Sequence, residues 1–318
     1  KAIKLQPSFA TAHFNLGNIL IHLENLKEAE ISIRKAIDLN PNLAEAHYSL
    51  GDILKNHGQL EGALDCYLKV IKIQPLNSNI YNSITELLKD SDPSLFQKSK
   101  LQATLNLLLK TNNIPHKELF KVFNFLYGKE LVDNLKNIQW DSFKEESFKL
   151  FINSEDIINA LRKVTFTDRR LESILTQARK YICHQICTNE EEISYSKLQF
   201  MIALGEQCFI NEYVYIYTIE EQIYINKIIN RCIDGKINEK YISILSCYFP
   251  LYKMIDRIPS LKTFTSSHKI FKDLIKLQVL EPLKEINLSK KIRNIGTIDN
   301  DISKNVKSQY EQNPYPRW

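Results

Sequence analysis

The chain has 318 residues, of which 44% are hydrophobic and 25% charged, and its formal net charge is +5. This composition is typical of a globular protein and excludes a largely disordered chain. Lysines and glutamates interleave along the sequence instead of forming one basic cluster, which argues against a nucleic-acid partner. With 8 glycines and 10 prolines there are too few turn-forming residues for a β-sandwich or barrel, so we predict an all-α fold.

The N-terminal part of the chain contains an internal repeat. Pro7, Pro41 and Pro75 are spaced 34 residues apart, and AHFNLGNIL at 12–20 aligns with AHYSLGDIL at 46–54. A repeat of this length, with a leucine and a glycine in its first half and a proline at its end, resembles the tetratricopeptide repeat. The resemblance implies pairs of antiparallel helices stacked into a solenoid.

Several repeat positions have a clear packing role. Gly17 and Gly51 stand where a side chain would hold the second helix of the pair away. His13 and His47 occupy the position at which the tetratricopeptide repeat usually has an aromatic residue. Each proline ends a second helix and turns the chain.

The repeat pattern begins and ends incompletely. KAIKLQP at 1–7 matches only the end of a second helix, so we expect an exposed apolar edge there, because terminal repeats normally have a polar cap. IYNSITELLK at 80–89 predicts the first helix of a third repeat, with Ile84 at the leucine position and Thr85 in place of the glycine. The pattern ends near Asp90, and we predict tetratricopeptide repeats over residues 1–91.

The resemblance implies that a protein or peptide partner binds along the concave surface, which the first helix of each pair lines. In this register the side chains on that surface are Phe14, Asn18, Ile21, Tyr48, Asp52 and Lys55. Asp52 would repel a carboxylate, so we do not expect the carboxylate-clamp type of ligand that some members of the family bind. The alternative is that these residues form an ordinary solvent-facing groove.

Residues 92–300 are predicted to form an all-helical domain, because apolar residues recur there at spacings of three and four. Asp92, Ser154 and Thr167 are expected to cap helices. From Asn211 the segment NEYVYIYTIEEQIYINKIIN alternates like a strand, but no partner strand is predicted nearby. We therefore predict one or two helices here, with partly buried tyrosines whose hydroxyls are hydrogen-bonded.

The six cysteines lie in apolar helical stretches, and we interpret them as reduced, mostly buried thiols of a cytoplasmic protein. They are Cys66, Cys183, Cys187, Cys208, Cys232 and Cys247. Cys183 and Cys187 lie one helical turn apart beside His184, but zinc needs four ligands and no second pair accompanies them, so we predict no metal site. No apolar run reaches the length of a membrane span.

Two features bear on catalysis. No two glycines form a G-x-G, so we expect no nucleotide or methyl-donor pocket of the usual kind in this chain. An enzyme acting around Glu206, Glu212 and Tyr213 is an alternative that requires a pocket with converging polar groups. The two glutamates are better candidates for buried polar contacts.

The C-terminal segment SKNVKSQYEQNPYPRW suggests a second family. Together with LRKVTFTDRRLESILTQARK, QCFINEYVYIYT and LQVLEPLKEI, it resembles a bacterial family of tetratricopeptide-repeat methyltransferases. The resemblance runs from about Leu161 to Trp318. It implies that this chain is the non-catalytic, interaction and substrate-presenting region of a larger S-adenosylmethionine-dependent methyltransferase. The catalytic domain and its S-adenosylmethionine site would then follow Trp318.

Residues 301–318 are accordingly predicted to form an extended arm that contacts the catalytic domain. Pro314 and Pro316 hold the residues before them in extended conformations. The arm residues expected to make the contact are Tyr310, Asn313, Pro314, Tyr315, Pro316, Arg317 and Trp318. The alternative to this whole interpretation is a free-standing tetratricopeptide scaffold that binds a partner peptide in its concave groove.

Overall fold

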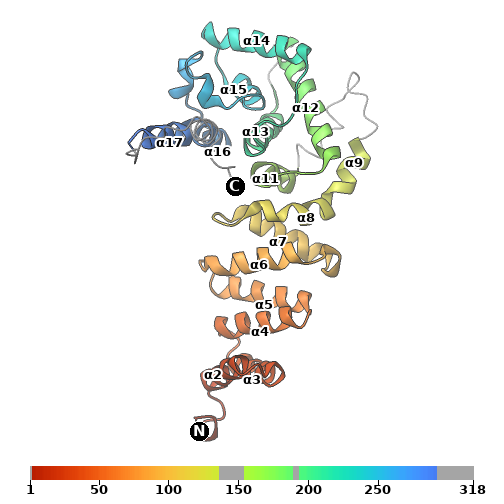
Figure 1. The fold of residues 1–318 in the computed structure, drawn as a ribbon, viewed down its shortest axis with the longest axis vertical. Coiled ribbons are helices and arrows are strands. Elements are labelled where there is room, and N and C mark those ends of the chain that lie inside the picture. The colour runs from red at the N-terminus through yellow and green to blue at the C-terminus, as the bar shows by residue number, and fades with distance from the viewer. Residues whose placement is uncertain (1, 136–153, 189–192, 292–318) are drawn as a thin grey trace, which may run out of the picture. The chain divides into compact units, whose positions relative to one another are not determined.

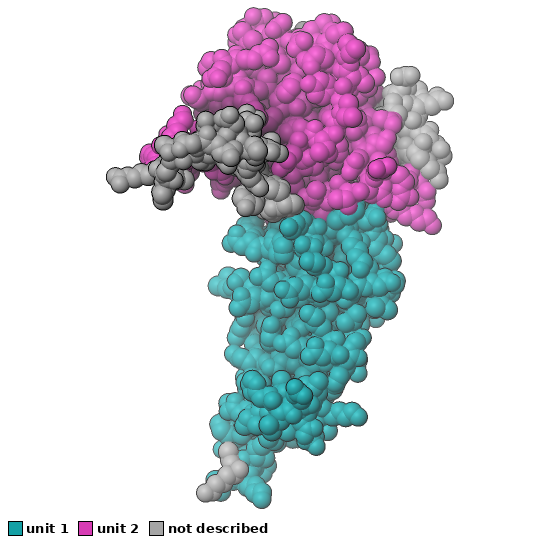
Figure 2. Space-filling view, viewed as in Figure 1, with its two compact units in different colours: residues 1–127 teal, residues 128–318 magenta. Residues whose placement is uncertain are grey.

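The computed structural model describes residues 2–135, 154–188 and 193–291. Within these ranges every regular element is helical and none is a strand, which confirms the all-α prediction. The chain divides into two compact units, residues 1–127 and 128–318 (Figure 2). The end of the repeat pattern near residue 91 therefore lies inside the first unit.

The first unit is built from stacked helical hairpins followed by further helices (Figure 1). Its α-helices are α1 (Ala2–Leu5), α2 (Ala10–His22), α3 (Leu26–Leu39), α4 (Ala44–Asn56), α5 (Leu60–Ile73), α6 (Ser78–Asp90), α7 (Lys98–Lys110) and α8 (Phe120–Phe123). Helices α2 and α3 form one hairpin, and α4 and α5 form the next. Because α3 also contacts α4 and α5 contacts α6, the hairpins stack in the order that the repeat predicts.

The glycines of the repeat allow the two helices of each hairpin to approach closely. A Cβ atom at Gly17 would lie 2.4 Å from Ile33 Cγ1, and one at Gly51 would lie 2.5 Å from Tyr67 Cε1. Both separations are far below van der Waals contact, so the packing role predicted for these glycines is confirmed. Thr85, which replaces the glycine in α6, is buried.

A side chain at one repeat position bonds to the carbonyl of the proline six residues before it. The three pairs, each at 2.9 Å, are His13 Nε2 with Pro7 O, His47 Nε2 with Pro41 O, and Tyr81 Oη with Pro75 O. A carbonyl oxygen only accepts, so each imidazole must hold its proton on Nε2 and donate it. Histidine can replace the usual aromatic residue because both supply a ring and a donor at this position.

The exchange between histidine and tyrosine can be tested at His47. His47→Tyr is expected to leave the free energy of unfolding of the repeats nearly unchanged, because Tyr81 makes the equivalent bond in the next repeat. His47→Ala removes the donor and is expected to lower the free energy of unfolding by about 1 kcal/mol. Urea unfolding followed by circular dichroism measures both changes, and equal losses in the two variants would contradict the assigned role.

The second unit is a cluster of helices in which α13 is central. Its α-helices are α9 (Lys129–Leu135), α11 (Glu155–Lys163), α12 (Arg169–Thr188), α13 (Tyr195–Ile210), α14 (Ile219–Ile233), α15 (Glu239–Leu245), α16 (Lys269–Ile275) and α17 (Glu281–Ser289). Helix α13 contacts α11, α12, α15 and α16. Residues 201–209 of α13 are all buried, so this helix forms the centre of the unit's core.

Helices α16 and α17 are joined by a π-helical turn, Lys276–Leu280. Pro282 follows this turn and has no N–H to donate to the carbonyl four residues before it. In the wider π turn the N–H of Glu281 bonds to Lys276 O, five residues back. We attribute the π turn to the proline, because the wider turn relieves the clash that a proline causes inside an α-helix.

Two of the three predicted helix caps are confirmed. The Asp92 side chain accepts a hydrogen bond from Ser94 N, and the Ser154 side chain accepts one from Ile157 N. The third prediction, that Thr167 caps α12, was wrong by one residue, because the cap is Asp168. Asp168 Oδ1 accepts from Arg170 N at 2.8 Å, since its carboxylate reaches the free N–H groups that begin α12.

We predicted one or two helices in the segment from Asn211. The prediction is confirmed from Ile219 onward, where α14 begins, but it is wrong for residues 211–218, which form an irregular link between α13 and α14. Glu212 and Tyr213 have φ angles of 59° and 60°, in the left-handed region that ends an α-helix. The prediction of hydrogen-bonded tyrosine hydroxyls is confirmed for Tyr213, which donates to Ser246 O at 3.2 Å. It is wrong for Tyr215, whose buried hydroxyl has no hydrogen-bond partner in the described residues.

Candidate functional site

The predicted groove residues lie on the first helices of the two hairpins. Phe14, Asn18 and Ile21 are on α2, and Tyr48, Asp52 and Lys55 are on α4. All six side chains are half-buried. Because the residues of each set are three or four positions apart, each set occupies one face of its helix. We refer to the six residues together as the groove row.

Asp52 is the most constrained member of the groove row. Tyr67 on α5 donates its hydroxyl to Asp52 Oδ1 at 2.6 Å, which fixes the carboxyl group against the second helix of its own hairpin. Burial raises the pKa of Asp52 above its ordinary value, and the Tyr67 hydrogen bond and the charge of Lys55 act in the opposite direction. Asp52 Oδ2 has no partner in the described residues and can accept a further hydrogen bond.

Tyr48 connects the groove row to α6. Its hydroxyl lies 3.2 Å from Ser83 Oγ on α6, and its ring centroid is 5.9 Å from that of Tyr67. The second repeat and α6 are thus joined through Tyr48. The row offers apolar side chains on α2 and a fixed carboxylate acceptor on α4. This combination suits a ligand that has an apolar side chain next to a hydrogen-bond donor.

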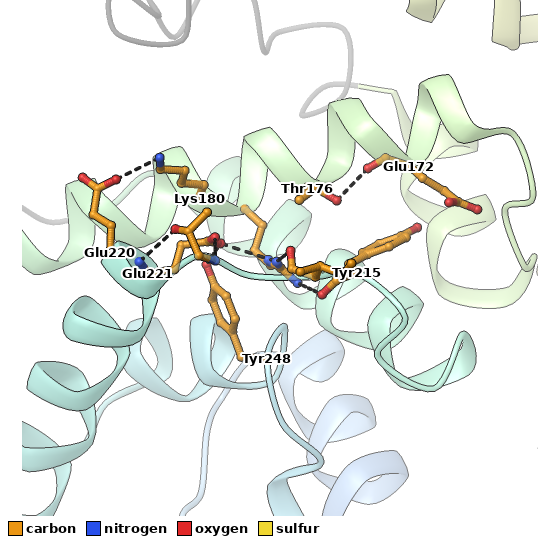
Figure 3. A network of polar contacts seen from close by, with 10 residues as sticks. Glu172, Thr176, Lys180, Tyr215, Glu220, Glu221 and Tyr248 are labelled. Atoms are coloured by element: carbon orange, nitrogen blue, oxygen red, sulfur yellow. Dashed lines mark hydrogen bonds and ion pairs between the residues drawn. The ribbon is translucent and has the colours of Figure 1, made fainter.

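The second unit contains a buried ion pair that the sequence analysis did not identify (Figure 3). Arg179 on α12 lies 3.4 Å from Glu221 on α14, and both side chains are 1% exposed. Tyr248 donates its hydroxyl to Glu221 Oε1 at 2.8 Å, and its ring lies 4.4 Å from the Arg179 guanidinium carbon. A sequence signal for Glu221 does exist, because Thr218 and Glu221 form the T-x-x-E capping box of α14.

Arg179 also holds the 211–218 link in place. Its guanidinium donates to Tyr215 O at 3.1 Å and to Ile216 O at 2.8 Å. These carbonyls belong to no helix, so the hydrogen bonds that they accept come from Arg179, which lies 36 and 37 residues earlier in the sequence. The buried pair therefore orders an irregular link, which is a structural role.

A second charged cluster connects three helices of the same unit. Arg162 on α11 donates Nε and Nη2 to the carboxylate of Glu206 on α13, and Nη2 also to Asp273 Oδ2 on α16 at 3.2 Å. Glu206 is buried, as we predicted. Burial raises the pKa of Glu206 to about 7, against the opposing effect of Arg162, while Asp273 raises it further and Lys163 lowers it.

The raised pKa of Glu206 predicts a pH-dependent stability. The unfolded chain releases this proton near pH 4.5, whereas the folded chain retains it to about pH 7. The folded state therefore binds more protons between these values, and the free energy of unfolding is expected to fall as the pH rises through this interval. Urea unfolding at pH 5 and pH 7 measures the fall. Glu206→Gln should remove most of it, and an unchanged pH dependence in this variant would contradict the assignment.

Gln278, in the π turn, is a hub of buried hydrogen bonds. Its Nε2 donates to Gly205 O at 2.8 Å and to Ser246 O at 3.4 Å, and its Oε1 accepts from the Tyr213 hydroxyl at 3.2 Å. Tyr213 hydrogen-bonds to Gln278 and Ser246, whereas Glu206 hydrogen-bonds to Arg162, so the two side chains share no hydrogen-bond partner. Glu212 is exposed on the turn after α13, so the prediction of a buried polar contact is wrong for this residue.

All six cysteines are free thiols, and five of them are buried while Cys66 is half-buried, as predicted. Burial raises the pKa of Cys183 and Cys208 to about 12. His184 is exposed, and its ring lies 5.2 Å from that of Tyr224. In the described residues no three His, Cys, Asp or Glu side chains gather as metal ligands would. Nor do the described residues include a helix long and apolar enough to cross a membrane.

The predicted arm residues, Tyr310 to Trp318, lie outside the described residues. The family model of the tetratricopeptide repeat matches residues 10–43 and 44–77, which are the two hairpins α2–α3 and α4–α5 with their connections. These residues are therefore two tetratricopeptide repeats, in the register that the sequence predicts. No curated protein matches the chain.

Proposed function

We propose that this chain is a protein-interaction scaffold that binds a segment of a partner protein along the groove row. Tetratricopeptide repeats at residues 10–77 support an interaction role. The observation that carries the assignment to this row is the fixed carboxylate of Asp52, which is held by Tyr67 through Oδ1 and belongs to the same row as half-buried aromatic and apolar side chains.

The groove row favours a particular ligand chemistry. Phe14 and Ile21 suit an apolar side chain, and Asp52 suits a lysine or arginine side chain or another donor. A peptide carboxylate would be repelled at Asp52 unless that residue were protonated. The partner segment is therefore expected to contain apolar and basic residues, and the carboxylate-clamp mode is not expected.

An array of synthetic peptides that combine Leu or Phe with either Arg or Glu tests this proposal. The basic peptides are expected to bind the chain, and Asp52→Asn should weaken their binding about tenfold, because the amide still accepts the Tyr67 hydrogen bond but has no charge. Asp38→Asn makes the same change on an exposed face of α3 and should have no effect. Equal binding of acidic and basic peptides, or equal effects of the two variants, would contradict the proposal.

A second candidate is favoured by the resemblance of QYEQNPYPRW and the blocks from Leu161 onward to tetratricopeptide-repeat methyltransferases. In this proposal the scaffold is the non-catalytic, substrate-presenting region of a cytoplasmic S-adenosylmethionine-dependent methyltransferase. S-adenosylmethionine would supply the methyl group in a separate catalytic domain, and the arm residues would contact that domain. Titration of the chain with S-adenosylmethionine in a calorimeter is then expected to give no binding heat, and saturable binding would contradict this proposal.

A further inference from the structure

Helix α14 has apolar side chains on two different faces. It lies at the edge of the second unit and contacts α12 and α15 (Figure 1). One face is buried, and its residues are Glu221, Ile225, Ile228, Ile229 and Cys232. The other face contains three exposed isoleucines, with exposed fractions of 86% for Ile219, 52% for Ile223 and 53% for Ile233. A helix at the surface of a unit normally has polar residues on its outer face, so the second apolar face is a candidate interaction surface.

The exposed face follows the residue spacing of a coiled-coil seam. Its residues are separated in turn by four, three, four and three positions, and they are Ile219, Ile223, Asn226, Asn230 and Ile233. At about 100° per residue, all five lie within about 80° of one another around the helix axis. This alternation is the heptad repeat, with Ile223 and Asn230 at a positions and the other three residues at d positions. We call these five residues the α14 seam.

The two asparagines of the α14 seam indicate what covers it. Both are exposed, and Asn226 Oδ1 accepts from Gln222 Nε2 at 3.1 Å, so the Asn226 amide nitrogen can still donate. A carboxamide contains both a donor and an acceptor, so it can pair with a second carboxamide in the same layer. Opposite an apolar side chain, the amide would be buried without a partner. Two identical helices, parallel and in register, set isoleucine against isoleucine and asparagine against asparagine in every layer.

The charges beside the α14 seam also favour two parallel copies. In a parallel pair, the g position Gln222 faces the e position Lys227 of the second copy, and no like charges meet at these positions. An antiparallel pair that opposes Ile223 to Ile233 would instead bring Lys227 next to Lys227 of the second copy. It would also bring Glu220 next to the second copy's equivalent of Asp234. Both contacts oppose like charges, which disfavours this arrangement.

We propose that the α14 seam binds the α14 seam of a second copy of this chain, parallel and in register, and forms a two-fold symmetric dimer. A contact of this kind closes on itself and leaves neither seam unpaired. Helix α14 is already folded against α12 and α15, so association does not have to form the helix. The α14 seam belongs to the second unit and shares no residue with the groove row, so this proposal is independent of the proposed function.

Sedimentation equilibrium of the full chain at about 5 to 500 μM tests the proposal. A reversible dimer with a dissociation constant of about 10–100 μM is expected, because two helices of 15 residues make a small interface. Ile223→Glu should raise this constant at least about tenfold, because it places two carboxylates in one layer. Ile31→Glu is the matched control and should leave the constant unchanged, since Ile31 is 69% exposed on α3, outside the seam. Circular dichroism verifies that both variants fold.

A cysteine in the α14 seam tests the direction of the two helices. In the parallel dimer Ile219 lies next to Ile219 of the second copy, so Ile219→Cys should form an intermolecular disulfide in oxidised glutathione. Ile31→Cys should form none. The unmodified chain is the control for the native thiols, of which Cys66 is half-buried and the others are buried.

Three results would overturn the proposal. The first is a chain that stays monomeric at about 500 μM, well above the expected dissociation constant. The second is equal weakening of the dimer by Ile223→Glu and Ile31→Glu, because the contact would then lie outside the α14 seam. The third is a dimer that Ile219→Cys does not crosslink, because its helices would then not be parallel and in register.

Discussion

Replacing Arg179 by methionine is expected to lower the free energy of unfolding of the second unit by about 3–5 kcal/mol. The substitution leaves the Glu221 carboxylate, which is 1% exposed, without its cation. It also removes the donors of two carbonyls in the 211–218 link. Methionine has a similar length, so the loss reports the removed charge and hydrogen bonds more than a cavity. Urea unfolding followed by circular dichroism measures it.

The neighbouring pair provides a matched control for this prediction. Lys180 and Glu220, each one position from the buried pair, are 2.9 Å apart, but their side chains are largely exposed. Lys180→Met is expected to cause no measurable change, because exposed pairs contribute little. Combining Arg179→Met with Glu221→Gln should recover part of the lost stability, since no unpaired charge then remains buried. Equal losses for Arg179→Met and Lys180→Met would contradict this account.

The second large effect is expected at Gly205, where α13 approaches the segment that follows α15. A Cβ atom at this position would lie 1.9 Å from Ser246 Oγ and 3.3 Å from the backbone carbonyl carbon of Ser246. Ser246 cannot readily move, because its hydroxyl donates to Ser243 O at 2.7 Å and its own carbonyl accepts from Gln278. Gly205→Ala is therefore expected to lower the free energy of unfolding by about 1–3 kcal/mol or more.

The same substitution at Gly62 should have the opposite sign. Gly62 lies in the first turn of α5, and a Cβ atom there would meet only the flexible end of Leu54 at 3.3 Å. Alanine stabilises a helix relative to glycine by up to about 1 kcal/mol, so Gly62→Ala should be neutral or stabilising. Thermal unfolding of both variants against the original chain gives the comparison. A destabilising effect at Gly62 as large as that at Gly205 would show that the close approach is not the cause.

Sequence periodicity predicted the repeat helices of the first unit well, because equivalent residues of a repeat make equivalent packing contacts. Helices α2 to α5 are related by a 34-residue shift, and the two glycines lie where the hairpin partner approaches. The same register placed the groove row on the first helices. It did not predict that Tyr67 would fix Asp52, because this bond depends on how the second helix sits against the first, 15 residues away.

The second unit was less predictable because its ordering contacts are distant in the sequence. Residues 211–218 alternate like a strand, yet they form an irregular link whose carbonyls bond to an arginine 36 and 37 residues earlier. Arg179 itself stands in a helix with a charged pattern and has no local signal of burial. Local sequence patterns predict helices, whereas the Arg179–Glu221 ion pair and the hydrogen bonds of Gln278 depend on tertiary packing.

The π turn between α16 and α17 also limits how the length of the chain can vary. A turn of this kind holds one residue more than an α-helical turn. Deleting one residue ahead of Gln278 within 276–280 would rotate its amide by about 100° around the helix axis relative to α16, away from Gly205 and Ser246, while Pro282 would still lack the N–H that an α-helical turn needs. Such a deletion would remove the hydrogen bonds of Gln278 to the core, so this short stretch is expected to keep its length in any functional variant.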